Sequence, residues 1–365
     1  MNSGYHLWSD IYDCRPEDVI VTQHVIARAV VNALGSKVTM VNQKPGAVSL
    51  SAYNLYIDGR AQMLQGGDKR LLYAREFFER AIAEDPAFGL AYLGLAAIHA
   101  RLIKWDLVPF NDNLAQAQVA AEKALEMHEH LSEAYAILAV VNSLQWRWKA
   151  ASQAFAIAFK NDPSSGELWE AYAITYLLPM KHLDQALEGI RKAETLDPLS
   201  PSIGVSEGLV HYFQRDYEMA ADKCRTALAV QPGLIGAHFG LASALAQQSR
   251  SAEAIADIES LKTLAEDPMV VSYSGYLAGA SGASRDARSA LVRLDAISEH
   301  KHVPCYYKSL IYLGMGNTGQ AMRSLEQAYV EREPSLIYLA VDPKWDRLRS
   351  HPRFIALLSK IGLPE

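Results

Sequence analysis

A repeat of about 34 residues is the feature that most limits the folds open to this chain. Residues 158–163 and 193–198 both begin with Ala and end with Asp-Pro. From there on, prolines recur at steps of 30 to 36 residues, at Pro163, Pro198, Pro232, Pro268, Pro304 and Pro334. A sustained period of this length indicates stacked structural repeats and not a single compact core. Eight copies can be counted within residues 46–334.

Each copy has the pattern of two helices joined by a turn. Proline fixes φ and has no amide proton, so it suits the first position of a helix and breaks the interior of one. In the copy that ends at Pro198, the residues Ala186, Ile190 and Ala193 share one helical face, because they are four and three positions apart. The small residues on this face allow close helix packing, since two helices approach closely only where side chains are small.

The order of large and small residues resembles the tetratricopeptide repeat. The matching residues run from Trp169-x2-Tyr172-Ala173-x2-Tyr176 through Ala186-x3-Ile190-x2-Ala193 to Pro198. The resemblance implies an all-α fold, a right-handed α-α superhelix in which the first helix of each pair lines a concave groove. We therefore predict eight helix pairs over residues 46–334.

The last segment, residues 335–365, predicts a cap for this array. Phe354, Leu357, Leu358 and Ile361 lie on one face of an amphipathic helix that ends at Gly362. A stacked array needs such a cap because its last repeat otherwise exposes an apolar face. The stretch from Asp346 to Leu358 also resembles the closing segment of bacterial signalling proteins that join a regulatory domain to tetratricopeptide repeats.

Residues 1–45 do not follow the repeat. Residues 4–13 alternate as a short aromatic strand does, and residues 16–35 predict one amphipathic helix. The segment resembles the end of a TolB-like, FlgO-type domain. In bacterial regulators that domain stands between tetratricopeptide repeats and either a winged helix, as in HilA- and CadC-like proteins, or a class III adenylate cyclase. We expect a small, truncated α/β remnant with a linker, through which the chain could pair with a second copy.

Composition narrows the functional class. The net charge of −6 gives no basic stripe for nucleic acid, so we expect no direct nucleic-acid binding. No run of 18 apolar residues occurs, so we expect no membrane span. The three cysteines, Cys14, Cys224 and Cys305, are far apart and odd in number, which suits a reducing, cytoplasmic compartment and buried structural thiols.

The sequence contains no motif of a known catalytic or nucleotide-binding site. We find no P-loop, G-x-G-x-x-G, H-E-x-x-H, C-x-x-C or G-x-S-x-G pattern. Two His-x-His pairs occur, at 128/130 and 300/302, and we interpret them as solvated turn histidines, because residues two apart on a helix point away from each other. We predict no enzyme activity, no catalytic residue, no cofactor and no metal site.

The predicted binding surface is the concave groove. The helical phase places a mixed, fairly apolar set of residues there: Arg101, Val140, Glu170, Ile174, Leu209, Tyr212, Phe213, Phe239 and Gln247. Trp146 and Trp148, in a predicted turn, could pack against the next repeat or form an aromatic edge for a partner. Such a groove suits a peptide held through apolar side chains.

Taken with the resemblance, these features predict a non-catalytic protein-interaction or sensor module of a bacterial cytoplasmic regulator, most simply a transcriptional one. The expected partner is a protein or peptide segment in the groove. Two alternatives stay open at this point: a stand-alone receptor for a signalling peptide or small molecule, and the sensor region of an adenylate cyclase.

Overall fold

The structure, a computed structural model, describes residues 49–65, 68–104 and 110–365. Within these ranges every regular element is a helix, which confirms the predicted all-α class for this part of the chain. The α/β remnant predicted for residues 1–45 lies outside the described residues. No helix in the described ranges is both long and apolar enough to cross a bilayer.

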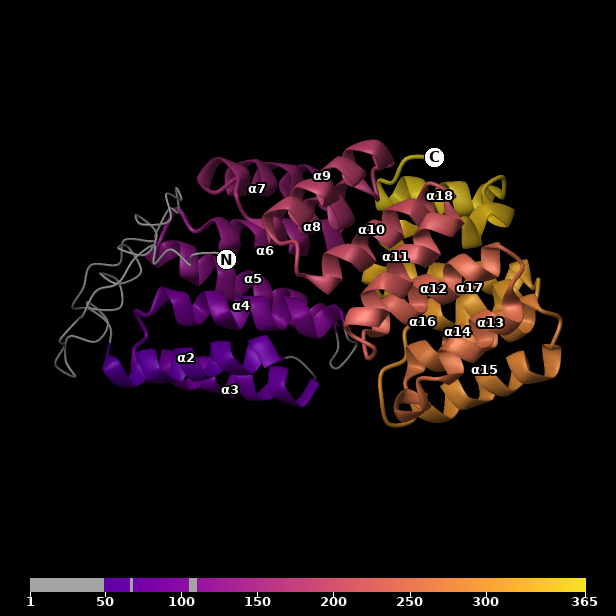
Figure 1. The fold of residues 1–365 in the computed structure, drawn as a ribbon, viewed down its shortest axis with the longest axis horizontal. Coiled ribbons are helices and arrows are strands. Elements are labelled where there is room, and N and C mark those ends of the chain that lie inside the picture. The colour runs from indigo at the N-terminus through magenta and orange to yellow at the C-terminus, as the bar shows by residue number, and fades with distance from the viewer. Residues whose placement is uncertain (1–48, 66–67, 105–109) are drawn as a thin grey trace, which may run out of the picture. The chain divides into compact units, whose positions relative to one another are not determined.

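Eight helix pairs follow one another along the described residues (Figure 1). The pairs are α2 (Leu50–Gln65) with α3 (Asp68–Glu84), α4 (Gly89–Lys104) with α5 (Phe110–Met127), α6 (Ser132–Leu144) with α7 (Trp148–Asn161), α8 (Gly166–Tyr172) with α9 (Leu183–Leu196), α10 (Pro201–Phe213) with α11 (Tyr217–Val230), α12 (Ile235–Gln247) with α13 (Ser251–Glu259), α14 (Pro268–Ala280) with α15 (Ser284–Ser298), and α16 (Cys305–Gly314) with α17 (Thr318–Val330). Helix α8 continues as the π-helix η2 (Ala173–Leu177), and the 3-10 turn η3 (Lys262–Leu264) follows α13.

The chain forms two compact units that divide inside α6, between Ile137 and Leu138. The first unit holds α2 to α4, most of α5 and the start of α6. The second holds the end of α6 and everything after it. The sequence predicted one array over residues 46–334, and nothing in the repeat period marks this division.

Close packing within and between the helix pairs depends on small residues. In the first unit, a Cβ atom on Gly59 of α2 or Gly94 of α4 would come within 2.8 Å or 2.6 Å of the ring of Phe78. In the second unit, a Cβ on Gly240 would lie 2.7 Å from Sγ of Cys224. One large side chain therefore fills the space that two neighbouring helices leave open, which is the packing expected of tetratricopeptide helix pairs.

The turns inside the pairs repeat with the same period. A residue with positive φ follows the first helix of each pair in the second unit, at Trp146, Lys181, Arg215, Ser249, Gly282 and Gly316. These positions follow each other at 33 to 35 residues. Four of the six are not glycine, although the left-handed region costs an ordinary residue about 1–2 kcal/mol. Packing of the two flanking helices must hold these turns, because their own residues do not favour the conformation.

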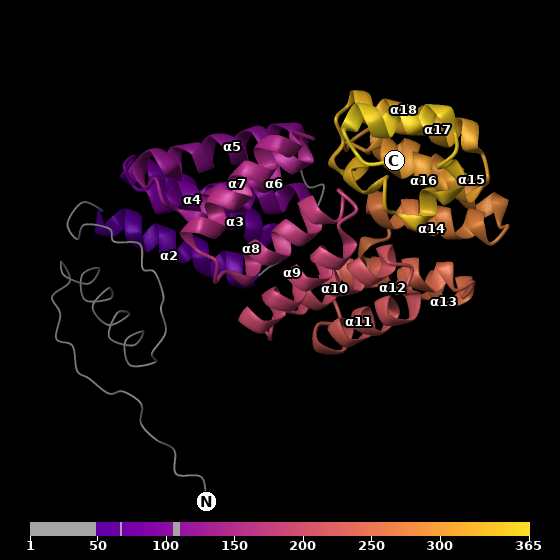
Figure 2. The same cartoon turned by 90° about the horizontal axis from the view of Figure 1, so that it is seen from above.

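The C-terminal segment consists of η4 (Pro334–Tyr338), η5 (Pro343–Leu348) and α18 (Pro352–Ile361). The predicted last helix is confirmed, with Phe354, Leu357, Leu358 and Ile361 buried. It ends at Gly362, whose φ of 76° is left-handed. Figure 2 shows α18 beside α17, both in yellow to orange. The C-terminal segment also contacts first helices of the helix pairs in the second unit. These contacts decide which surfaces of that unit a partner can reach.

Candidate functional site

The predicted groove residues of the second unit lie on the first helix of each helix pair. Val140 is on α6, Glu170 on α8, Ile174 on η2, and the others are on α10 (Leu209, Tyr212, Phe213) and α12 (Phe239, Gln247). Helix α8 contacts α10 through Glu170 and Ser206, and α10 contacts α12. Phe239 of α12 contacts Tyr273 of α14, and α14 contacts α16, so these helices form one continuous layer. We call the side of this layer that faces the C-terminal segment the inner face. Arg101 is separate from this set, because it lies on α4 in the first unit and is partly buried there.

Tyr212 and Phe213 do not face an open groove. Their exposed fractions are only 2% and 4%, and the chain's own C-terminal segment covers them. The Tyr212 hydroxyl donates to Oδ1 of Asp342 at 3.2 Å, and the Phe213 ring lies 5.4 Å from the ring of Tyr338. The prediction that these two rings contact a partner is therefore wrong for this structure. No sequence pattern indicated this contact, because the cap was expected at the end of the array.

Phe239 is also buried. Its ring lies 4.5 Å from the ring of Tyr273 on α14, the first helix of the following pair. The prediction of Phe239 as a partner contact is therefore also corrected, because the Phe239 ring fills the space between two repeats. Gln247, at the end of α12, is only partly buried.

Trp146 and Trp148 bind the C-terminal part of the chain. Trp146 stacks on Tyr329 of α17, and the guanidinium of Arg332 lies 5.7 Å from the Trp146 ring centroid. The indole N–H of Trp148 donates to the carbonyl of Ile361 at 2.8 Å. Both tryptophans pack within the chain, but against the last helix pair and the terminal helix and not against the next repeat, and neither forms a free aromatic edge.

A buried ion pair fixes the C-terminal segment against the inner face. Nζ of Lys344 lies 2.9 Å from Oδ2 of Asp342, and both side chains are 5% exposed. The same ammonium lies over the rings of Tyr212 and Tyr273, at 5.1 Å and 5.6 Å from their centroids. Burial alone would lower the pKa of Lys344, but the carboxylate of Asp342 and the neighbouring tyrosines raise it above its usual range. The amine therefore stays charged, and its role is to hold the segment in place.

The inner face remains partly exposed between α8 and α10. Glu170 accepts a hydrogen bond from the Ser206 hydroxyl at 2.6 Å on one oxygen, and the Ser202 hydroxyl lies 3.4 Å from the other. Ile174 follows Glu170 by four residues and Leu209 follows Ser206 by three, so each pair shares a helix face. All of these side chains, and Val140, are partly exposed. A partner can therefore reach this part of the predicted groove.

The helix carrying Glu170 widens into a π-helix after Tyr172. The backbone N–H of Leu178 donates to the carbonyl of Ala173, five residues earlier, and Pro179 follows immediately. A proline inside a regular helix clashes with the carbonyl four residues before it, and one wider turn relieves that clash. Thr175 also donates its hydroxyl to the carbonyl of Ala171. Since π-turns are frequent at functional sites, this local widening beside Glu170 and Ile174 adds weight to the α8–α10 region.

A group of possible metal ligands lies at the start of α16. One ligand atom each from Cys305, Glu331 and Glu333 falls within 4.8 Å of the others. Both oxygens of Glu333 already accept backbone N–H groups, from Cys305 at 2.6 Å and from Tyr306 at 3.0 Å. Burial and the nearby Glu333 and Glu331 raise the pKa of the Cys305 thiol to about 12. Because the Cys305 thiol is neutral and the Glu333 carboxylate caps a helix, we interpret this group as structural and not as a metal site.

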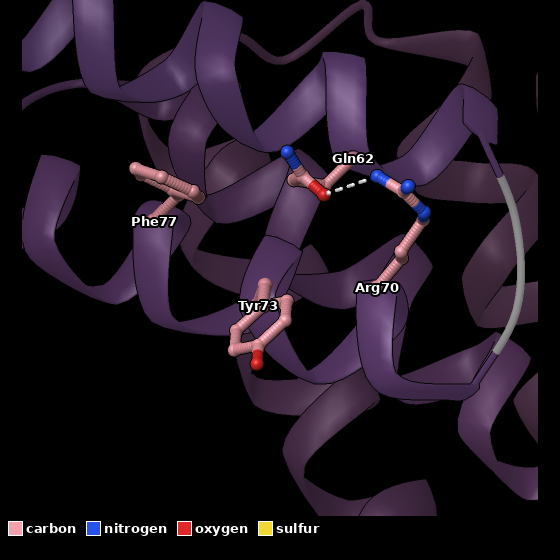
Figure 3. A pocket seen from close by; sticks show the side chains of 4 residues that line it. All are labelled: Gln62, Arg70, Tyr73 and Phe77. Atoms are coloured by element: carbon pink, nitrogen blue, oxygen red, sulfur yellow. Dashed lines mark hydrogen bonds between the residues drawn. The ribbon is translucent and has the colours of Figure 1, made fainter.

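The first unit has an open depression on the surface of α2 and α3 that the sequence did not indicate. It has a volume of about 520 Å³ and is lined by Gln62, Arg70, Tyr73 and Phe77 of α2 and α3 (Figure 3). Arg70 donates to the side-chain oxygen of Gln62 at 3.2 Å, and Tyr73 is 53% exposed. The volume falls in the range of small-molecule sites, but such sites enclose most of their ligand, and this depression is open.

Comparison with known proteins supports the fold and gives one relative. No protein-family model matches this chain. A protein of Rhizobium meliloti (strain 1021) named "Putative adenylate cyclase 3" is 31% identical over 156 residues, which are 40% of this chain and 25% of that protein. The chain thus spans a quarter of the length of this relative.

Among solved structures, the human IFIT1 dimer with m7Gppp-AAAA has a TM-score of 0.60 at 16% identity, covering 86% of this chain and 80% of that chain. A tetratricopeptide repeat protein from Parabacteroides merdae has a TM-score of 0.49 at 15% identity, covering 73% of this chain and 100% of that chain. At such identities the likeness to IFIT1 shows a common helical-repeat fold and does not transfer a ligand.

Proposed function

We propose that this chain is a non-catalytic protein-interaction module of a bacterial signalling regulator, and that a protein or peptide segment binds the inner face between α8 and α10. The observation that carries the proposal is that the chain's own C-terminal segment covers one part of the inner face and leaves another part exposed to a partner. The C-terminal segment covers Tyr212 and Phe213, whereas Val140, Glu170, Ile174 and Leu209 stay partly exposed.

The match with the Rhizobium meliloti protein favours one type of regulator. That protein is named "Putative adenylate cyclase 3", and 156 residues of this chain match a quarter of its length. Of the two regulator types that the sequence resemblance implies, the sensor region of an adenylate cyclase is therefore favoured over a transcriptional regulator. In this proposal, cyclase chemistry belongs to a different part of such a protein, and this chain supplies a binding surface of the kind that helical-repeat arrays use.

Two measurements test this function. First, the purified chain is incubated with ATP and Mg²⁺ or Mn²⁺, and we expect no cyclic AMP. Accumulation of cyclic AMP would overturn the non-catalytic assignment.

Second, a displayed library of random 12-residue peptides is selected against the immobilised full chain. We expect an enriched peptide family that no longer binds when Leu209 is changed to Asp. The matched control is Leu199→Asp, at a turn residue that is 88% exposed, and it should leave binding unchanged. Melting curves of both variants show whether each is folded. Equal binding by folded Leu209→Asp would remove the inner face as the binding surface.

A further inference from the structure

The carboxylate of Glu170 is the only charged group among the reachable inner-face residues named above. Its two oxygens lie 2.6 Å and 3.4 Å from the hydroxyls of Ser206 and Ser202 on α10. Ser202 is in turn 3.0 Å from the hydroxyl of Ser200. These neutral hydroxyls orient the carboxylate between the two helices, but they bring no positive charge to it.

No cation of the described chain neutralises this carboxylate. The ion pairs found within residues 49–65, 68–104 and 110–365 include no Lys, Arg or His side chain within 4.0 Å of Glu170. By contrast, Glu207 on the same α10 is buried and paired with Lys223 on α11. A partly desolvated carboxylate gains more from a hydrogen-bonded cation than an exposed one does, because the local dielectric is lower.

The residues on either side of Glu170 are apolar. Ile174 lies one helical turn after Glu170, and Leu209 lies one turn after Ser206, both partly exposed and packed at the edge of the core. A ligand that crosses this region therefore meets one negative charge flanked by aliphatic side chains. The complementary ligand is a chain in which a basic residue stands between apolar ones.

We infer that the inner face between α8 and α10 binds a basic, partly apolar peptide segment of a protein partner, with a Lys or Arg side chain on the Glu170 carboxylate. This inference rests on the proposed function and names the chemistry of the partner. The apolar side chains of the segment lie against Ile174 and Leu209. The alternative, that Glu170 only ties α8 to α10 through the serines, predicts no dependence of binding on its charge.

The test uses the full chain and fluorescent 12-residue peptides in which Leu alternates with Lys, with norleucine or with Glu. Fluorescence anisotropy at low and high salt measures the affinity. We expect the Lys peptide to bind, the Glu peptide not to bind, and Glu170→Gln to weaken binding of the Lys peptide at least about tenfold. The control Glu188→Gln, on the exposed surface of α9 in the same pair, should change nothing. The charge reversal Glu170→Lys should transfer binding to the Glu peptide.

The outcomes separate this inference from the function on which it rests. Equal affinity of wild type and folded Glu170→Gln for the Lys peptide would overturn it. Equal affinity for the Lys and norleucine peptides would also overturn it, while leaving apolar peptide binding intact. Failure of every peptide here, together with failure of the library selection, would remove both the inference and the proposed function.

Discussion

Trp146 stacks on Tyr329 with 5.3 Å between ring centroids and 8° between ring planes. Trp146 lies in the turn between α6 and α7, near the start of the second unit, and Tyr329 lies on α17, in the last helix pair. The first and last repeats of this unit are therefore in direct contact. In an open array each repeat touches only its neighbours, so the stacked pair marks a closed arrangement.

The closing contact should contribute to stability. We expect Trp146→Ala to lower the free energy of unfolding by about 1–3 kcal/mol, because stacking and the area buried by a partly exposed indole are both lost. Urea unfolding followed by tyrosine and tryptophan fluorescence measures the change. A double-mutant cycle with Tyr329→Ala isolates the pair, and additive effects would show that the two rings do not interact in solution.

The Lys344–Asp342 pair should behave as a buried ion pair. Changing Lys344 to Met leaves the Asp342 carboxylate without its cation, so we expect a loss of about 3–5 kcal/mol. The double variant with Asp342→Asn removes that unpaired charge and should regain part of the loss. Chemical denaturation of the wild type and the two variants checks the order of their stabilities. If the single variant were as stable as the double variant, the ion pair would have to be solvated and not buried.

Two glycines of the second unit should respond to alanine in opposite directions. At Gly240 a Cβ would lie 2.7 Å from Sγ of Cys224, so Gly240→Ala should cost about 1–3 kcal/mol through overpacking. At Gly204, on α10, no atom lies within 4 Å of the added Cβ, and Gly204→Ala should stabilise by about 0.5–1 kcal/mol. Adding Cys224→Ala to Gly240→Ala should restore much of the loss. Thermal unfolding compares all four proteins.

The thiols of Cys224 and Cys305 should be unreactive at neutral pH. Burial raises the pKa of each to about 12, with nearby carboxylates adding to the shift. In a Cys14→Ser background, alkylation by iodoacetamide should stay slow from pH 7 to pH 9 and become fast in denaturant. Rapid labelling of the folded protein at pH 8 would contradict the raised pKa of these thiols.

The raised pKa values of Cys224 and Cys305 also make the stability of the fold depend on pH. An unfolded thiol ionises near its usual pKa of about 8.5, whereas the folded thiols remain protonated until about pH 12. Their contribution is therefore fully present below about pH 8.5 and is lost progressively as the pH rises toward the folded pKa. Unfolding midpoints measured from pH 7 to pH 10.5 should fall more steeply for this chain than for a Cys224→Ala, Cys305→Ala variant.

The sequence predicted the repeated elements well because their causes are local. Proline at helix starts and small residues at offsets of three and four, as in Ala186, Ile190 and Ala193, indicate the helix pairs without any knowledge of distant contacts. The terminal helix with Phe354 and Ile361 inward was predicted for the same reason. The left-handed turns at Trp146, Lys181 and Arg215 were not, because no glycine marks them.

The filled part of the inner face could not be predicted from the sequence. Tyr212 and Phe213 have the helical phase predicted for groove residues, and in the structure they lie under the C-terminal segment. What covers them is Asp342 and Tyr338, far along the chain, and no local pattern links these positions. The serines that hold Glu170 were missed for a similar reason, since the pairing of Ser206 with Glu170 depends on how α8 and α10 meet.

The C-terminal segment has one more consequence, for how such a protein can evolve. Open arrays gain or lose whole repeats readily, because a new repeat needs to match only its two neighbours. Here Trp148, Tyr212 and Glu326 each contact a fixed point on one short tail, at Ile361, Asp342 and Arg353. Duplication or deletion of a helix pair would put these points out of register. The number of repeats in the second unit is therefore set by the length of its tail, and lineages that change one must change the other.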